Sequence, residues 1–242
     1  MQPVFCIQLE AQGFSMNIIS SFIDLVLHLD KHLVSLLNQV GALVTYAILF
    51  GVIFIETGLV IFPFLPGDSL LFAAGSLAAL PNSPLNILIL FILLGFAAVL
   101  GDSVNYAIGH SIGTRVYTDK IRFIKKEYID RTHQFYEKHG GKTIFLARFI
   151  PIIRTFAPFV AGVGEMSYGK FFSYNVLGGI TWTALFLFGG YFFGNLKFVQ
   201  DNFSFVIIAI IVISFTPVAY EAVRARRDAR ASKPAPEELK ND

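Results

Sequence analysis

Residues 62–75 read Phe-Pro-Phe-Leu-Pro-Gly-Asp-Ser-Leu-Leu-Phe-Ala-Ala-Gly, an apolar stretch that is interrupted by two prolines and a glycine and that carries Asp68. Residues 149–162 read Phe-Ile-Pro-Ile-Ile-Arg-Thr-Phe-Ala-Pro-Phe-Val-Ala-Gly and carry Arg154. Proline removes a backbone donor, and irregular backbone at membrane depth is tolerated only where protein buries it or where it lines a wet cavity. We therefore expect re-entrant hairpins at about residues 63–80 and 143–164.

The two stretches align with each other without gaps, and Phe, Phe, Ala and Gly are identical in register. Interrupted hydrophobic segments in corresponding halves of a chain are typical of transporters built from inverted repeats, where they mark the substrate site. The alignment favours a pseudo-inverted repeat, although so few identities in apolar sequence are also compatible with chance.

The composition is that of a membrane protein. Of the 242 residues, 55% are hydrophobic and 15% charged, against about 25% charged in ordinary soluble domains. The net charge of +2 gives no electrostatic case for nucleic acid, and one cysteine, Cys6, forms neither an intrachain disulfide nor a CxxC site. No cleaved signal sequence is expected, and Met16 is an alternative start of translation.

Long uncharged stretches predict about four membrane-spanning helices, because about 20 apolar residues cross a bilayer. The predicted helices cover roughly residues 42–61, 85–110, 171–194 and 203–221. Residues 18–40 are amphipathic, which predicts a helix that lies along the bilayer interface or packs on its own protein. The expected fold class is therefore an all-α polytopic membrane protein with two opposed re-entrant hairpins and amphipathic surface helices.

Basic residues gather in residues 115–142 and in the tail after Tyr220, so both should face the cytoplasm. Residues 117–138 alternate basic and apolar side chains, which predicts a surface helix on the inner leaflet. An even number of spans places the N-terminus in the cytoplasm as well. The first hairpin then enters from outside and the second from inside, so that they meet near the midplane.

Four charged residues fall inside these apolar segments: Glu56, Asp68, Arg148 and Arg154. Each ion costs about 2.5–3.5 kcal/mol at the bilayer centre, which predicts that the acids pair with the arginines. Arginine forks suit bidentate phosphate binding, so Arg148 and Arg154 are the candidate phosphate ligands. Glu56 and Asp68 are candidate counter-charges or proton carriers. The alternative is a set of salt bridges that only fixes the hairpins.

Other polar residues give weaker indications. Asp102 is a candidate relay carboxylate, with a helix cap or a partner for an interfacial lysine as the more favoured interpretation. Trp182 is expected to pack against lipid and neighbouring helices. The histidines lack companions at ligand spacing, so neither a metal nor another cofactor is expected.

Several motifs resemble the DedA family, also called the VTT or SNARE-associated family. They are Phe54-Ile-Glu-Thr-Gly58, Phe64-Leu-Pro-Gly-Asp-Ser69, Gly101-Asp102, Phe135-Tyr-Glu-Lys-His-Gly140, Arg148-Phe-Ile-Pro-Ile-Ile-Arg-Thr155 and Ala161-Gly162. The resemblance covers residues 17–222, between an extension at 1–16 and a basic, partly disordered tail at 223–242. It implies a multi-pass protein of the bacterial inner membrane with two opposed hairpins that moves lipids between leaflets. The family's essential residues fall on Glu56, Asp68, Arg148 and Arg154.

The expected function is a flippase for a lipid with a phosphate headgroup. The resemblance points first to undecaprenyl phosphate and second to phosphatidylethanolamine, with protons as a coupled partner. Competing hypotheses are a proton-coupled small-ion antiporter, a purely structural role and a membrane lipid phosphatase. The last is disfavoured because the histidines lie outside the charged hairpins. The oligomeric state, including a homo-oligomer, stays open.

Overall fold

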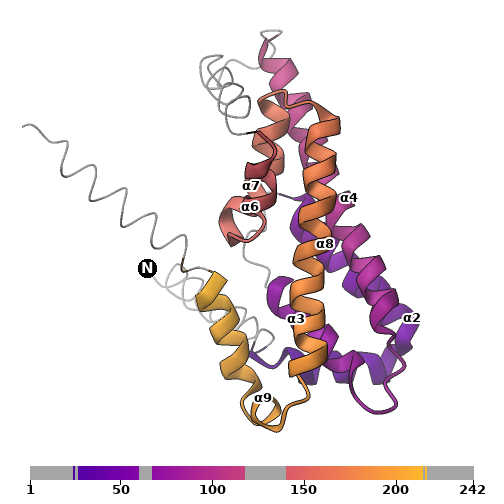
Figure 1. Cartoon of the computed structure of the whole chain (residues 1–242). Coiled ribbons are helices and arrows are strands. Elements are labelled where there is room, and N and C mark those ends of the chain that lie inside the picture. The colour runs from indigo at the N-terminus through magenta and orange to yellow at the C-terminus, as the bar shows by residue number, and fades with distance from the viewer. Residues whose placement is uncertain (1–23, 25–26, 60–66, 118–139, 215, 217–242) are drawn as a thin grey trace, which may run out of the picture.

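The computed structural model describes residues 24, 27–59, 67–117, 140–214 and 216, and all its regular elements there are helices (Figure 1). The helices are α2 (Leu29–Gly58), α3 (Gly67–Ala78), α4 (Ile87–Tyr117), α6 (Lys142–Ala147), α7 (Pro151–Val163), α8 (Tyr168–Phe193), α9 (Lys197–Asp201) and an apolar helix at Phe203–Ser214. The predicted extension at 1–16, most of the basic surface helix at 117–138 and the tail at 223–242 lie outside the described residues.

The frame of the molecule is the antiparallel pair α4 and α8, which confirms the predicted long apolar helices at 85–110 and 171–194. The Phe91 and Phe188 rings lie 5.4 Å apart, and Asn175 Nδ2 donates to the Val99 carbonyl oxygen at 3.0 Å. Within the described residues, three helices are long and apolar enough to cross a bilayer: α2, α4 as far as Gly113, and α8. The outward faces of α4 and α8 carry exposed Ile92, Phe96, Leu177 and Leu185, as lipid contact requires.

Helix α2 is bent at Gly41, whose φ of 77° is a backbone conformation that glycine adopts readily. The bend separates the predicted amphipathic helix from the apolar segment that follows. Residues 42–58 then run parallel to α4: Tyr46 Oη accepts from Asn86 N at 2.6 Å, and Gly58 packs on Gly101 at the middle of α4. The predicted direction of the first span is therefore wrong, since residues 42–61 were expected to run opposite to 85–110.

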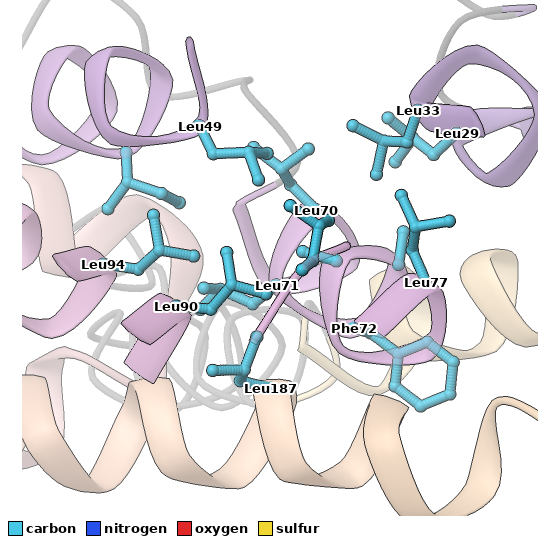
Figure 2. Close-up of a cluster of buried hydrophobic side chains, with 14 of the residues drawn as sticks. Leu29, Leu33, Leu49, Leu70, Leu71, Phe72, Leu77, Leu90, Leu94 and Leu187 are labelled. Atoms are coloured by element: carbon cyan, nitrogen blue, oxygen red, sulfur yellow. The ribbon is translucent and has the colours of Figure 1, made fainter. Parts of the chain in front are cut away.

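Helix α3 returns beside α2 and runs parallel to α8, so residues 42–58 and α3 form an antiparallel pair, here called the first hairpin. The expected hairpin at 63–80 is thereby corrected. The observed hairpin begins earlier in the sequence, because its first helix is residues 42–58. Ten of the twelve residues of α3 are buried. Figure 2 shows Leu70 and Leu71 of α3 among leucines of α2, α4 and α8, so the first hairpin forms the centre of the larger core.

Helices α6 and α7 form the second hairpin, which packs from the opposite end of the α4–α8 pair. Gly141, before α6, lies against Tyr174 in the first turns of α8, whereas Val163 lies against Gly113 near the end of α4. The break between the two helices spans residues 148–150, close to the expected hairpin at 143–164. It occurs there because a residue before proline is driven out of the helical region, and Ile150 is extended before Pro151 (φ −116°, ψ 108°).

The two hairpins make equivalent close contacts with the long helices: α3 packs on α8 in the same way as α7 packs on α4. A Cβ placed on Gly75 of α3 would lie 1.9 Å from the Leu187 carbonyl oxygen, and one placed on Gly162 of α7 would lie 2.1 Å from that of Tyr106. These two glycines occupy the same register in the internal alignment. The neighbouring phenylalanines do likewise: the Phe72 carbonyl oxygen meets Gly190, and the Phe159 carbonyl oxygen meets Gly109. The matched contacts support the pseudo-inverted repeat.

Residues 29–40 pack on the end of the molecule where α8 finishes. Leu29, Leu33 and Leu37 are buried in the larger core, and Ser204 Oγ donates to the Leu27 carbonyl oxygen at 2.8 Å. The amphipathic segment therefore packs on its own protein, one of the two predicted alternatives. It lies at the end opposite to Gly113, from which the basic connection leads away. Residues 29–40 and the end of α4 therefore lie at opposite ends of the molecule, because residues 42–58 stop at mid-molecule, and the side of the membrane that each faces stays a prediction.

Candidate functional site

The first hairpin brings Glu56 and Asp68 to the middle of the α4–α8 pair. Glu56 lies in the last turn of α2 and Asp68 in the first turn of α3, where a negative charge is favourable. Gly67 N donates to Glu56 Oε1 at 3.2 Å. A Cβ on Gly67 would lie 1.9 Å from Glu56 Oε2, so any larger residue here would displace the Glu56 carboxylate from its present position.

The second hairpin brings its two arginines to the same place from the other end. Arg148 caps the C-terminus of α6, which favours a cation, and Arg154 lies in the first turn of α7. Both side chains are buried, at 4% and 9% exposure of the residue. Buried charges require partners, which the tip of the first hairpin supplies to Arg154 and helix α4 supplies to Arg148.

Arg154 joins the two hairpins directly. Its Nη2 donates to Glu56 Oε1 and its Nη1 to Asp68 Oδ1. Two further groups hold Asp68: Trp182 Nε1 donates to Oδ1 at 2.8 Å, and Ser214 Oγ donates to Oδ2 at 2.9 Å. The predicted pairing of both acids with an arginine is therefore seen for Arg154.

Arg148 has a different acid as its partner. Its Nη2 donates to Asp102 Oδ2 and to Asn175 Oδ1, and Asp102 is 5% exposed. The favoured interpretation of Asp102, a cap or a partner for an interfacial lysine, is wrong, as is the pairing of Arg148 with Glu56 or Asp68. Asp102 lies at mid-height on α4, and hydropathy alone could not show that the second hairpin reaches that depth.

Trp182 is the largest of the site residues that sequence reasoning missed, and Asn175 and Ser214 are others. Trp182 is 1% exposed, and the Arg148 and Arg154 Cζ atoms lie 5.9 Å and 5.1 Å from its ring. Both distances are within cation–π range. The predicted packing against neighbouring helices is confirmed, whereas the predicted packing against lipid is wrong because the side chain is buried in the larger core. Its sequence signal was slight: one indole N–H donor in a helix rich in phenylalanine. Asn175, whose amide side chain lies in the same apolar helix, was a second sequence signal that this helix contributes to the site.

The five charged residues Glu56, Asp68, Asp102, Arg148 and Arg154 are called the ion cluster below. A cavity of about 10 Å³ lies within it, lined by Glu56, Thr57, Asp102, Arg148, Arg154, Thr155 and Trp182. That is room for about one water molecule. Glu56 Oε2, Arg148 Nε and Arg154 Nε are buried without a hydrogen-bond partner among the described residues. They are groups that a water or an anionic ligand could satisfy.

All five residues predicted from sequence thus come together, and their roles as phosphate ligands, proton carriers or relay stay predictions. Within the described ranges, no group of three or more His, Cys, Asp or Glu side chains is arranged to hold a metal ion. The ion cluster is held together by pairing between arginines and carboxylates.

Comparison with known proteins gives consistent matches. The model of the VTT domain family matches residues 65–192, which hold most of the ion cluster. The chain is 52% identical over 220 residues to Protein DedA of Escherichia coli K12, covering 90% of this chain and 100% of that protein. It is 46% identical over 189 residues to an uncharacterised membrane protein of Mycobacterium tuberculosis H37Rv, covering 76% and 83% of the two chains.

A more distant relative is the inner membrane protein YqjA of Escherichia coli K12. It is 34% identical over 161 residues, which cover 65% of this chain and 70% of that protein. No solved structure matches this chain significantly.

Proposed function

Because the chain belongs to the DedA family of VTT-domain membrane proteins, we propose that it moves lipids with a phosphate headgroup between the two leaflets. The observation that carries this proposal is the ion cluster itself. Two hairpins from opposite ends of the molecule meet at the buried Arg154, and the second hairpin buries Arg148 against α4 and α8. Each arginine keeps an unpartnered Nε donor within the described part of the chain. Arginine forks are the side chains best suited to a phosphate.

The charge of the ion cluster supports proton coupling. Three carboxyl groups face two guanidinium groups, so the fully ionised cluster would carry a formal charge of −1. An uncompensated buried charge is costly, and one bound proton removes it. A phosphate that displaced the carboxylates from the arginines would leave those acids unpaired, so its arrival should be accompanied by proton uptake.

Transport through this site requires the hairpins to separate. A cavity of about 10 Å³ is too small for a phosphate group, so the arrangement seen here is closed to the lipid. The pseudo-inverted repeat offers a route: each hairpin packs against both long helices from its own end, and either could withdraw to open one side. The lipid tails would stay in the bilayer throughout.

We place the chain in the inner membrane with its basic connection, residues 115–142, in the cytoplasm. The second hairpin then enters from the cytoplasmic side and the first from the outer side, and both are re-entrant. Residues 29–40 lie at the outer end in this placement, which replaces the expected cytoplasmic side for this segment. Undecaprenyl phosphate is the first candidate substrate and phosphatidylethanolamine the second.

The test is leaflet-resolved transport of a lipid phosphate in proteoliposomes that contain the full chain. We expect Arg154→Ala and Arg148→Ala to reduce the rate at least tenfold, since each removes a charge-assisted contact. The matched control is Lys170→Ala, which removes an exposed cation at the start of α8. Transport at the wild-type rate in both arginine variants would overturn the proposal.

A proton-coupled small-ion antiporter is the second candidate, and the small cavity favours it, because a space of about 10 Å³ suits a small ion or a water better than a headgroup. The same proteoliposomes distinguish the two functions. Ion-dependent proton flux that survives loss of both arginines, without lipid movement, would favour the antiporter. We propose no catalytic step for either function.

A further inference from the structure

A second, much larger cavity lies at the end of the molecule that we place outside. Its volume is about 610 Å³, which lies in the range of small-molecule sites. Three elements form most of its wall: residues 29–40, α3 and the end of α8. Its lining residues are Asp30, Lys31, Val34, Ser35, Asn38, Ala73, Ser76, Leu77, Leu80, Gly194, Asn195, Gln200 and Phe203.

The cavity has two chemically different parts. Its floor is apolar and buried, formed by Ala73, Leu77 and Phe203. Its rim is polar and accessible, with Lys31 and Asn38 exposed and further hydroxyl and amide groups beside them. A lipid at a bilayer interface has its polar and apolar parts in the same order: a polar headgroup is followed by the first methylene groups of its chains.

The charges on the rim are balanced. Asp30 and Lys31 are successive residues of one helix, so their side chains leave the helix in different directions. Among the described residues, neither of them forms an ion pair with another side chain. A rim with one fixed carboxylate and one fixed ammonium group, both without partners there, is complementary to a headgroup that itself carries one charge of each sign.

The cavity is connected to the ion cluster through two shared helices. Helix α3 carries Asp68 at its start and contributes Ser76 and Leu77 to the cavity wall. The Phe203–Ser214 helix contributes Phe203 to the cavity, and its Ser214 donates to Asp68. At 1.5 Å per residue, the eight positions from Asp68 to Ser76 span about 12 Å. The seam between these helices therefore leads from the cavity towards the arginines.

We propose that this cavity docks the headgroup of a zwitterionic phospholipid, one with a phosphate and an ammonium group, before the headgroup reaches the ion cluster. Lys31 binds the phosphate, Asp30 binds the ammonium group, and the apolar floor receives the start of the acyl chains. The proposal rests on the proposed lipid transport and, of its two candidate substrates, favours the zwitterionic phosphatidylethanolamine over the anionic undecaprenyl phosphate. It accounts for where a headgroup binds while the ion cluster has no room for it.

The test measures binding of short-chain lipids to the purified full chain by native mass spectrometry. The probes are dihexanoyl phosphatidylethanolamine, dihexanoyl phosphatidylglycerol and a short polyprenyl monophosphate. We expect the wild-type chain to bind the ethanolamine lipid several-fold more tightly than either anionic probe. Tighter binding of the glycerol lipid or of the monophosphate would overturn the zwitterionic assignment.

Variants locate the site. Lys31→Gln should weaken binding of the ethanolamine lipid about tenfold, as expected for loss of a contact between a charged donor and a phosphate. Asp30→Asn should weaken the ethanolamine lipid but not the glycerol lipid, and Ser35→Trp should fill the cavity and abolish both. The matched controls are Lys170→Gln, Asp201→Asn and Leu43→Trp, all at exposed positions outside the cavity lining. Unchanged binding in Lys31→Gln and Ser35→Trp would overturn the proposal.

The two proposals fail separately. Arg154→Ala should abolish transport and keep headgroup binding in the cavity, because Arg154 does not line it. Binding that is sensitive to Lys31→Gln in a chain that transports no lipid would leave the docking site standing and remove the transport proposal. A chain that transports lipid, but whose lipid binding is unchanged in Lys31→Gln and Ser35→Trp, would leave the transport proposal standing and remove the docking site.

Discussion

Trp182 Nε1 donates to Asp68 Oδ1 at 2.8 Å, so a side chain of α8 holds the same carboxylate oxygen that Arg154 of the second hairpin binds. The indole ring also lies beside both guanidinium groups. Trp182 therefore contacts one acid and both bases of the ion cluster, and it does so from a long helix that belongs to neither hairpin. This position would let it fix the distance between the two hairpin tips.

Trp182→Phe tests this relationship, since it keeps an aromatic face and removes the N–H donor. A hydrogen bond to a charged group is worth about 1.5–3 kcal/mol, so we expect a lower melting temperature and lipid transport slowed about tenfold. Thermal unfolding and proteoliposome transport are the two measurements. Phe192→Leu, at a 67% exposed position of the same helix, is the control. Wild-type transport and stability in Trp182→Phe would show that the indole only fills space.

The Arg148–Asp102 pair gives a prediction about stability. Asp102→Asn leaves the buried Arg148 with Asn175 but without an acid, and removal of one partner of a buried pair costs about 3–5 kcal/mol. Asp102→Asn combined with Arg148→Gln removes both charges and should recover most of that loss. The measurement is a double-mutant cycle of thermal stability, with the exposed Asp201→Asn as control. Additive losses would contradict direct coupling between the two side chains.

Sequence reasoning found the charged residues of the site because the cost of a buried ion does not depend on the fold. Glu56, Asp68, Arg148 and Arg154 could be selected from their apolar surroundings alone, and the need for partners predicted that they meet. The partner of Arg148 could not be selected in this way. Asp102 lies in a helix that also carries polar residues towards its end, so its burial depends on how deep the second hairpin reaches.

The direction of residues 42–58 was the main error in the predicted fold. Hydropathy gives the length of an apolar segment, and 17 helical residues extend about 25 Å, close to what a span requires. It does not say whether the segment leaves on the far side or turns back at mid-depth. The first hairpin is stabilised by the contacts of Glu56 with Gly67 and with Arg154, and Arg154 is 98 residues away in the sequence.

Glycine-to-alanine substitutions should differ strongly in their effect on stability, depending on whether the glycine is one of those that repeat between the hairpins. In Gly75→Ala and Gly162→Ala the new methyl group would lie about 2 Å from a carbonyl oxygen, so the helices must separate. Overpacking of this kind costs about 1–3 kcal/mol. In Gly51→Ala, where a Cβ meets nothing within 4 Å, the same change should be neutral or stabilise α2.

Thermal unfolding of the three glycine variants gives the comparison. Gly75→Ala and Gly162→Ala should lower the melting temperature by similar amounts, because they occupy equivalent positions in the repeat. A lower melting temperature in only one of the two variants would mean that the two hairpins are not packed equally closely. It would also weaken the case for a functional two-fold relation between them.

The sidedness of the molecule is open to a labelling experiment. Ser35 packs at the end of the molecule where α8 finishes, and Asn82 precedes α4 at the same end, whereas Lys170 lies in the first turn of α8 at the opposite end. All three are exposed. In a Cys6→Ser background, cysteines at 35 and 82 should react with a membrane-impermeant maleimide added from outside, and a cysteine at 170 should react only after the membrane is opened. Residue 35 labelled from the cytoplasmic side together with residue 170 would contradict the parallel arrangement of residues 42–58 and α4, because that arrangement puts the two positions at opposite ends of the α4–α8 pair.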